Sequence, residues 1–222
     1  MKKTDLELQR DVINEIHWDP SADGEIGVAA KDGVITLSGT VNSHAHKFSV
    51  IRAAERVFGV KAIAEDLVVK LPTSALRSDT DIAHAAVAAL KWNVQVPPDR
   101  LMVRVDDGWL VLEGSVDWEY QRKAADESIR SLTGVKGVTN SITITQRPAA
   151  GDVRRRIEEA LKRSAEVDAR HVSVETRDGR VVLRGTVRSW TERKDAERAA
   201  WSAPGVTAVE DQLAISVPVL PA

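Results

Sequence analysis

The chain has 222 residues, with 31 basic and 33 acidic side chains, a formal net charge of −2 and no cysteine. The lack of cysteine excludes disulfides and thiolate metal sites, and the balanced charge argues against a nucleic-acid-binding protein, which would carry a strongly basic surface. No run of about 18 apolar residues, the length needed for a transmembrane helix, is present in the sequence.

Nine glycines divide the chain into three copies of one unit. Within each copy the second glycine follows the first by 6 residues and the third follows the second by 20, and the copies are offset by 75 and then 71 residues. A fixed glycine spacing marks a repeated backbone geometry, so we expect structural roles for these positions. The three triplets are Gly33, Gly39 and Gly59; Gly108, Gly114 and Gly134; and Gly179, Gly185 and Gly205.

The first predicted element of each copy is an amphipathic helix. Its apolar residues recur every four positions, which places them on one face, and a residue that can cap a helix precedes each stripe. The stripes are Leu8, Val12 and Ile16; Ile82, Ala86 and Leu90; and Val153, Ile157 and Leu161, with predicted N-caps at Thr4, Asp79 and Asp152.

A β-hairpin follows each helix. Alternating apolar residues, such as Ile26, Val28 and Ala30 in the first copy, predict a half-buried strand. An Asp-Gly pair then suits the positive φ angles of a type I′ turn, and a second alternating strand returns. The second glycine lies in a Leu-x-Gly-x-Val motif, where we expect a bend at which the strand leaves the sheet. The turn pairs are Asp32-Gly33, Asp107-Gly108 and Asp178-Gly179.

A second amphipathic helix and a third strand complete each copy. The third glycine is expected at the C′ position that closes this helix. The unit therefore reads helix, strand, strand, helix, strand, and predicts an α+β fold in which two helices cover one face of a small three-stranded mixed sheet. The apolar positions of the second helices are Val50, Ala54 and Val57; Ala125, Ile129 and Leu132; and Ala196, Ala200 and Ala203.

The three units are joined by short linkers, at residues 72–74 and 147–151. Segments of this length allow small reorientations but not free tethering, so a compact array is expected. We place the domains at residues 1–72, 77–147 and 150–218.

On the glycine frame, the Asp-Gly hairpin and the Leu-x-Gly-x-Val motif, the chain resembles the BON domain family, named for bacterial osmotically inducible and nodulation proteins, in three tandem copies. The resemblance implies αββαβ domains, a role in osmotic or envelope stress like that of the osmotically inducible members, and binding to phospholipid surfaces. It brings no catalytic residues and no cofactor. Family members occur in the periplasm or at the outer membrane, whereas the start of this sequence lacks the apolar run of a signal peptide. We therefore expect a cytoplasmic protein, or a periplasmic one if the N-terminus is truncated.

Tryptophan accounts for six of the nine aromatic residues. Trp18 and Trp92 occupy equivalent places after the first helix, and we expect them to cover the edge of the core. The remaining aromatic residues of the second copy stand beside cations and form an amphipathic edge that could contact lipid headgroups or a partner. The alternative is that these tryptophans pack between copies. The candidate binding residues are Trp109, Trp118, Tyr120, Arg122, Lys123 and Trp190.

Metal binding and catalysis are both poorly supported. His44 and His46 are two positions apart, which on a helix turns them away from each other, and no nucleophile, carboxylate pair or phosphate loop recurs between copies. The basic run Arg154–Arg156 is followed directly by Glu158 and Glu159, as on a solvated helix face. Two hypotheses remain: a non-catalytic stress protein that adsorbs to phospholipid or envelope components, and a cytoplasmic interaction scaffold or chaperone-like adaptor.

Overall fold

The computed structural model describes residues 3–145, 152–164 and 167–216 and contains three units with the same order of elements. The predicted linker at residues 147–151 lies outside the described part. In the first unit the elements are α1 (Asp5–Trp18), β1 (Glu25–Lys31), β2 (Val34–Val41), α2 (His44–Arg56) and β3 (Ala62–Val69). In the second they are α3 (Asp79–Trp92), β4 (Leu101–Asp106), β5 (Trp109–Val116), α4 (Glu119–Arg130) and β6 (Gly137–Ile144). In the third they are α5 (Val153–Arg163), β7 (Val172–Arg177), β8 (Arg180–Val187), α6 (Trp190–Trp201) and β9 (Ala208–Ile215). Short 3₁₀ turns, η1 (Thr73–Ala75), η2 (Pro98–Arg100) and η3 (Ala169–His171), lie between elements.

Each unit has its own mixed sheet and its own core. The first two strands pair antiparallel and the second and third pair parallel, so the α+β prediction of a three-stranded sheet is confirmed. Three separate clusters of buried apolar residues lie between the sheets and their helices. The hairpin turns also form as expected, because Asp32 and Gly33 both have positive φ, of 53° and 85°, as a type I′ turn requires.

The second glycine of each unit does not end the strand, contrary to the prediction. Gly39 pairs with Ile26 on one side and Leu67 on the other, and β2 continues to Val41. Its φ is +119°, and a Cβ atom there would lie 2.0 Å from the carbonyl oxygen of Glu25. The glycine is needed because two backbone segments approach closely, and Gly114 and Gly185 meet the same restriction from Arg100 and His171.

Two predicted helix ends are displaced. The N-cap of α3 is Ser78, whose hydroxyl accepts from the Asp81 N–H, whereas Asp79 instead accepts from the N–H groups of Asp107 and Gly108 in the hairpin turn. The third glycine is not the C′ residue. α2 ends at Arg56 with an extended C-cap, and Gly59 lies beyond it in the turn between Val57 and Val60. The predicted caps Thr4 and Asp152 are confirmed.

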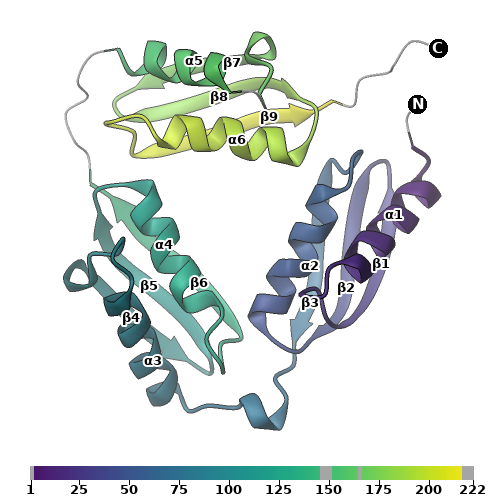
Figure 1. The fold of residues 1–222 in the computed structure, drawn as a ribbon, viewed down its shortest axis with the longest axis vertical. Helices are drawn as coiled ribbons and strands as arrows, with labels where there is room; N and C mark the ends of the chain where they lie inside the picture. Colours follow the sequence, from purple (N-terminus) through teal and green to yellow (C-terminus); the bar gives the residue numbers. More distant parts are fainter. Residues whose placement is uncertain (1–2, 146–151, 165–166, 217–222) are drawn as a thin grey trace.

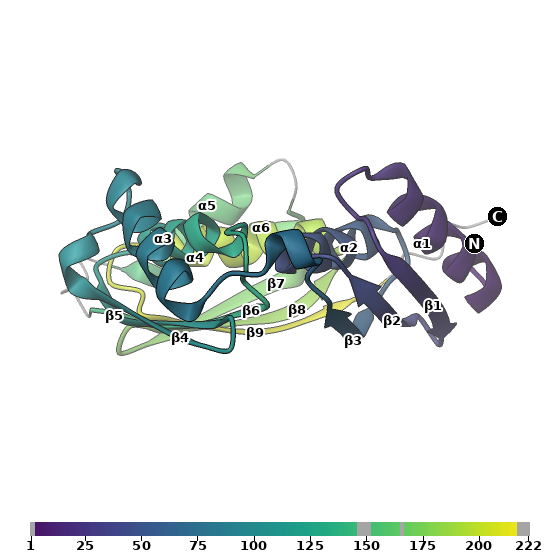
Figure 2. The same cartoon turned by 90° about the horizontal axis from the view of Figure 1, so that it is seen from below.

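The three units close into a ring (Figure 1). The second helix of each unit (α2, α4 and α6) faces the centre, and the first helix (α1, α3 and α5) lies on the outer side. Figure 2 shows the helices of all three units on one side of the ring and the sheets on the other. The expectation of a compact array is borne out, and the inner helix of each unit faces those of the other two.

Candidate functional site

The inner helices meet head to tail. The start of α2 lies against the end of α4, where the Arg130 guanidinium stacks on the Phe48 ring at 3.6 Å from its centroid. The start of α4 meets the end of α6, where Arg122 lies over the Trp201 ring at 5.0 Å. The start of α6 in turn contacts α2, through an ion pair between Lys194 and Glu55. At each of the three junctions, the start of one inner helix therefore lies against the end of another.

Equivalent positions supply one side of each junction. Glu55, Arg130 and Trp201 occupy the same place in their units, since they are separated by the repeat offsets of 75 and 71 residues. On the other side Phe48 and Lys194 are equivalent to each other, whereas Arg122 is one position before their equivalent in the second unit. The helix-end position is thus shared by the three units, whereas the chemistry changes from a cation–π contact at two junctions to an ion pair at the third. A head-to-tail contact of this kind forms a ring only when its rotation closes, as it does here after three units.

The first residue of each inner helix is partly buried at these junctions. His44, Glu119 and Trp190 are equivalent, and the buried Nδ1 of His44 and Nε1 of Trp190 have no hydrogen-bond partner among the described residues. Burial lowers the pKa of His44, and the charges of Arg130 and Lys47 act in the same direction. Burial raises the pKa of Glu119 despite its ion pair with Arg122 at 2.7 Å.

Each inner helix is also fastened to the third strand of its own unit at one equivalent position. Lys47 pairs with Glu65 at 2.6 Å, and Arg193 pairs with Asp211 at 2.6 Å. In the second unit the Asn140 amide donates to the carbonyl of Arg122 at 3.2 Å. These links hold each inner helix on the sheet of its own unit and so fix the positions of the junction residues.

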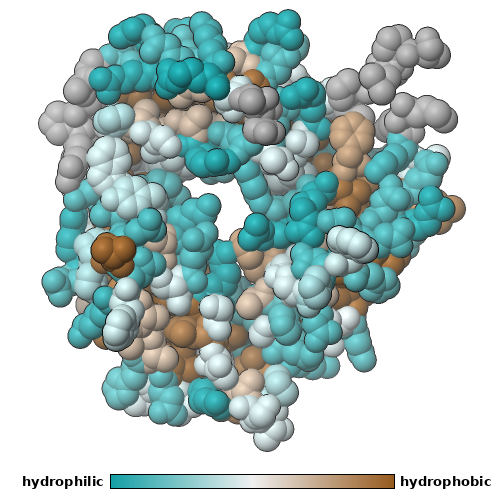
Figure 3. Space-filling model, viewed as in Figure 1, coloured by the Kyte–Doolittle hydropathy of each residue, from teal (hydrophilic) through white to brown (hydrophobic). Residues whose placement is uncertain are grey.

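A cavity of about 1040 Å³ lies among the three inner helices. The space-filling view in Figure 3 shows an opening at the centre of the ring with a largely hydrophilic rim. Aromatic rings and cations alternate on its wall, together with three carboxylates. The lining residues that carry this chemistry are Phe48, Trp118, Tyr120 and Trp201; Arg52, Lys123, Arg130, Lys194 and Arg198; and Glu119, Glu127 and Glu197.

The sequence-predicted binding residues fall into three places. Trp118, Tyr120 and Lys123 line the central cavity, and Arg122 lies beside it at the junction with Trp201. Trp190 packs against the core of the first unit, which is the alternative of packing between copies. Trp109 lies apart from both.

Trp109 covers the outer face of the second sheet. Its ring lies over Gly137, where a Cβ atom would come within 2.4 Å of it, and its Nε1 donates to Thr139 at 2.9 Å. The glycine leaves room for the indole on the partner strand, and the ring remains 48% exposed. This tryptophan therefore belongs to the sheet surface and not to the cavity.

The prediction that Trp18 and Trp92 cover the core edge is wrong. They are the last residues of α1 and α3, and their side chains are 83% and 89% exposed. The last buried residues of these helices are Ile16 and Leu90, two positions before the tryptophans. The next position on the buried face would come one or two residues after each tryptophan, where the helix has already ended. The two indoles consequently project into solvent.

Sequence reasoning missed the part of the cavity wall contributed by the first and third units. Phe48, Arg52 and Trp201 come from helices whose polar faces read as ordinary solvated surface. A signal was present in the repeat itself, because the exposed positions of the second helices include large aromatic residues in each copy. Which of these aromatic residues contact one another depends on how the three units pack in the ring.

The described residues contain no group of three or more side chains suited to a metal ion. His44 lies at the junction with α4, whereas His46 lines a separate pocket between α1 and β1 in the first unit, so the two histidines face different surroundings. The two rings thus share no common ligand position.

Comparisons with known proteins agree with the repeat. The model of the BON domain matches residues 4–70, 78–146 and 150–216. The chain is 34% identical over 122 residues to the Osmotically-inducible protein Y of Escherichia coli (strain K12), an alignment that covers 53% of this chain and 61% of that protein. Two solved structures of CdsD, a structural protein of the type III secretion system of Chlamydia trachomatis, align over 95% and 96% of this chain and 92% and 100% of theirs. They share 16% identity with it and have TM-scores of 0.28 and 0.27, too low to inform its fold or function. The family match covers nearly the whole length of the three units, and the chain therefore belongs to the BON domain family, with three tandem copies of the domain.

Proposed function

We propose that this protein is a non-catalytic stress protein that binds anionic phospholipid surfaces peripherally, without spanning the bilayer. Its membership of the BON family and its similarity to an osmotically inducible protein support a role in osmotic or envelope stress. No helix in the described residues is long and apolar enough to cross a bilayer. Contact with a lipid surface would therefore rest on exposed side chains.

The observation that carries the proposal is the pair of exposed tryptophans at equivalent helix ends. Trp18 and Trp92 stand at the ends of α1 and α3, two of the outer helices, which lie on the helix side of the ring in Figure 2. Val94, two residues after Trp92, is 99% exposed. A large apolar side chain exposed to water contributes no hydrophobic stabilisation to the fold, whereas an indole is well suited to the headgroup layer of a membrane.

The third unit places a cation at the same position. Arg163 is equivalent to Trp18 and Trp92, ends α5 and is exposed, with Lys162 beside it. Two of the earlier arginines of this helix are already paired, Arg154 with Glu158 and Arg155 with Glu159. Two indoles and a basic helix end therefore offer both of the attractions, apolar and electrostatic, that hold peripheral proteins on anionic lipid.

The test is co-sedimentation of the full chain with liposomes, followed together with tryptophan emission. We expect pelleting with vesicles that contain phosphatidylglycerol, little with pure phosphatidylcholine, and weakening as salt rises, because exposed charges are screened. The Trp18→Ala/Trp92→Ala variant should lose most of the binding. Trp109→Ala is the matched control, since it removes another exposed tryptophan from the sheet side.

Three outcomes would contradict the proposal. Unchanged pelleting of the double variant would move the contact elsewhere, and loss of binding in the Trp109 variant would point to the sheet face. Absence of any vesicle binding would favour the protein-interaction scaffold instead. Substitution of Trp118 or Arg122, the residues first indicated by the sequence, tests the cavity and its junction and is a less direct probe of a surface contact, because both side chains are partly buried.

A further inference from the structure

We propose that the central cavity binds a small organic anion that carries a flat aromatic ring. The site is independent of the surface contact proposed above, because it is built from α2, α4 and α6 and not from the ends of the outer helices. No single unit contains it. It exists only when the three junctions are closed.

The aromatic wall can hold a flat ring. Phe48, Trp118, Tyr120 and Trp201 reach the cavity from three different helices. Two of these rings already have a guanidinium stacked on one face, which keeps the side chains fixed in the wall. Offset or edge-to-face contacts between aromatic rings add attraction beyond the burial of apolar area, so a planar ligand gains more here than a flexible chain would.

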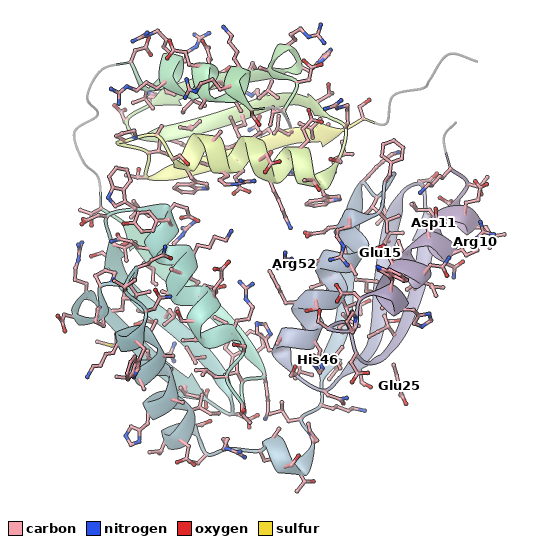
Figure 4. All side chains as sticks on the ribbon, viewed as in Figure 1. Arg10, Asp11, Glu15, Glu25, His46 and Arg52 are labelled. Atoms are coloured by element: carbon pink, nitrogen blue, oxygen red, sulfur yellow. The ribbon has the colours of Figure 1, made fainter. Side chains whose placement is uncertain are left out.

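The positive charge available to a ligand comes chiefly from Arg52. Arg130 pairs with Asp126, Lys194 with Glu55, and Arg198 with Asp195, so these cations are already compensated. Among the described residues, no ion pair includes Arg52, whose guanidinium lies 5.9 Å from the centroid of the Phe48 ring. In Figure 4 its side chain extends from α2 toward the centre of the ring.

Two of the three carboxylates of the wall are paired with cations. Glu119 pairs with Arg122 and Glu127 pairs with Lys123 at 3.8 Å, whereas Glu197 accepts from the neutral Trp201 Nε1–H at 3.4 Å and keeps its charge. Glu197 lies on α6, a different helix from that of Arg52. An anionic group at Arg52, with its ring against the aromatic wall, satisfies the charge and the aromatic features at once.

The size of the cavity agrees with a ligand of this class. At about 1040 Å³ it lies just above the usual range of about 300–1,000 Å³ for small-molecule sites, which are concave, contain aromatic side chains and place a few polar groups to fix orientation. A two- or three-ring anion fits with room for water. A macromolecule does not.

The experiment compares two probes with closely related ring systems. 8-Anilinonaphthalene-1-sulfonate carries a sulfonate, and N-phenyl-1-naphthylamine is its uncharged analogue. Binding to the intact chain is followed by probe fluorescence and by energy transfer from tryptophan. We expect the sulfonate to bind more tightly than the neutral probe, with a stoichiometry of one.

Variants then locate the site. Arg52→Ala should weaken binding of the sulfonate about tenfold, the factor expected for loss of one charge-assisted hydrogen bond, and leave the neutral probe unchanged. Arg10→Ala is the control, because Arg10 is also an exposed arginine of the first unit but lies on α1, away from the centre (Figure 4). Circular dichroism and the midpoint of unfolding verify that both variants fold.

The Trp18→Ala/Trp92→Ala variant separates this site from the lipid surface and should bind the sulfonate as the parent does. Equal affinity for the two probes would overturn the assignment of an anion. Equal loss in the Arg52 and Arg10 variants would overturn the location, as would binding that disappears with Trp18 and Trp92.

Discussion

The Arg130 guanidinium lies over the ring of Phe48, 3.6 Å from the ring centroid, and joins the second unit to the first. Asp126, one turn earlier on α4, pairs with the same guanidinium and fixes its direction. The contact combines a cation–π interaction with an ion pair along one helix, and both partners are only partly exposed. We expect closure of the ring at this junction to depend on it.

Replacement of Arg130 by Ala should therefore loosen the first junction. A cation–π contact of this kind contributes roughly 0.5–2 kcal/mol, so closure should weaken by that amount while each unit stays folded. The chain has no cysteine, so spin labels can be attached cleanly at Arg10→Cys and Lys91→Cys, on α1 and α3. Pulsed electron–electron double resonance should give a broader distribution of distances between the two labels in the Arg130→Ala variant than in the parent. Arg104→Ala, on the outer sheet face, should leave the distribution narrow, and an unchanged Arg130 variant would show that closure has another origin.

The first unit should be stabilised by His46→Gln. The equivalent Gln121 accepts from the N–H groups of Asp117 and Trp118 at 3.0 and 3.1 Å, and the equivalent Glu192, only 3% exposed, accepts from those of Asp168 and Arg188. Within the described parts of the chain His46 makes no such bond, and its buried Nδ1 has no hydrogen-bond partner there.

Glutamine at this position should supply the missing cap and raise the free energy of unfolding by about 0.5–1 kcal/mol in urea. Gln121→His is the reciprocal variant and should lower it. A fall in stability for His46→Gln would mean that the imidazole makes a packing contribution larger than the cap.

Stability should depend on pH through His44. Because burial and the charges of Arg130 and Lys47 lower its pKa in the folded protein, although Asp126 and Glu65 oppose them, the folded state favours the neutral ring. Its contribution is complete above the ordinary pKa of about 6.5 and is lost as the pH falls toward the lowered value. Glu119 acts in the opposite sense, since its pKa is raised and the folded state gains stability as the carboxyl is protonated.

The two contributions can be separated by urea unfolding between pH 8 and 5. In a Glu119→Gln background the loss of stability toward pH 5 should be steeper than in the parent. Adding His44→Gln should flatten it. A profile that does not respond to His44→Gln would show that the imidazole titrates normally and that the junction does not bury it in solution.

The second glycine of each unit should tolerate no side chain. Gly39→Ala would place a Cβ atom 2.0 Å from the Glu25 carbonyl oxygen at a φ of +119°, and should cost at least about 1–3 kcal/mol of unfolding free energy. Gly27→Ala is the control on the neighbouring strand. There the Cβ atom meets only the Ser38 hydroxyl, at 2.9 Å, which can rotate away. Similar midpoints of thermal unfolding for the two variants would contradict this account.

Local sequence signals are sufficient to predict the architecture of the unit. The Asp-Gly turns, the alternating strands and the four-residue helical stripes are local signals, because a hairpin or helix is decided by residues close together in the chain. The repeat made these signals stronger, since each appears three times. Two predictions failed because the residue interacts with another element. Asp79 accepts a hydrogen bond from the hairpin turn and does not cap its helix, and Gly39 is required by the close approach of the Glu25 carbonyl in the preceding strand.

The surfaces that meet between units depend on how the folded units pack together. Lys194 pairs with a carboxylate 139 residues away, and no local pattern indicates that partner. The three inner helices carry different side chains at equivalent positions, so their meeting depends on the angle at which each unit packs on the next. That angle is set by small non-local contacts, which a periodic pattern does not record. The ring therefore brought Arg52 and Trp201 to one cavity and left Trp18 and Trp92 in solvent.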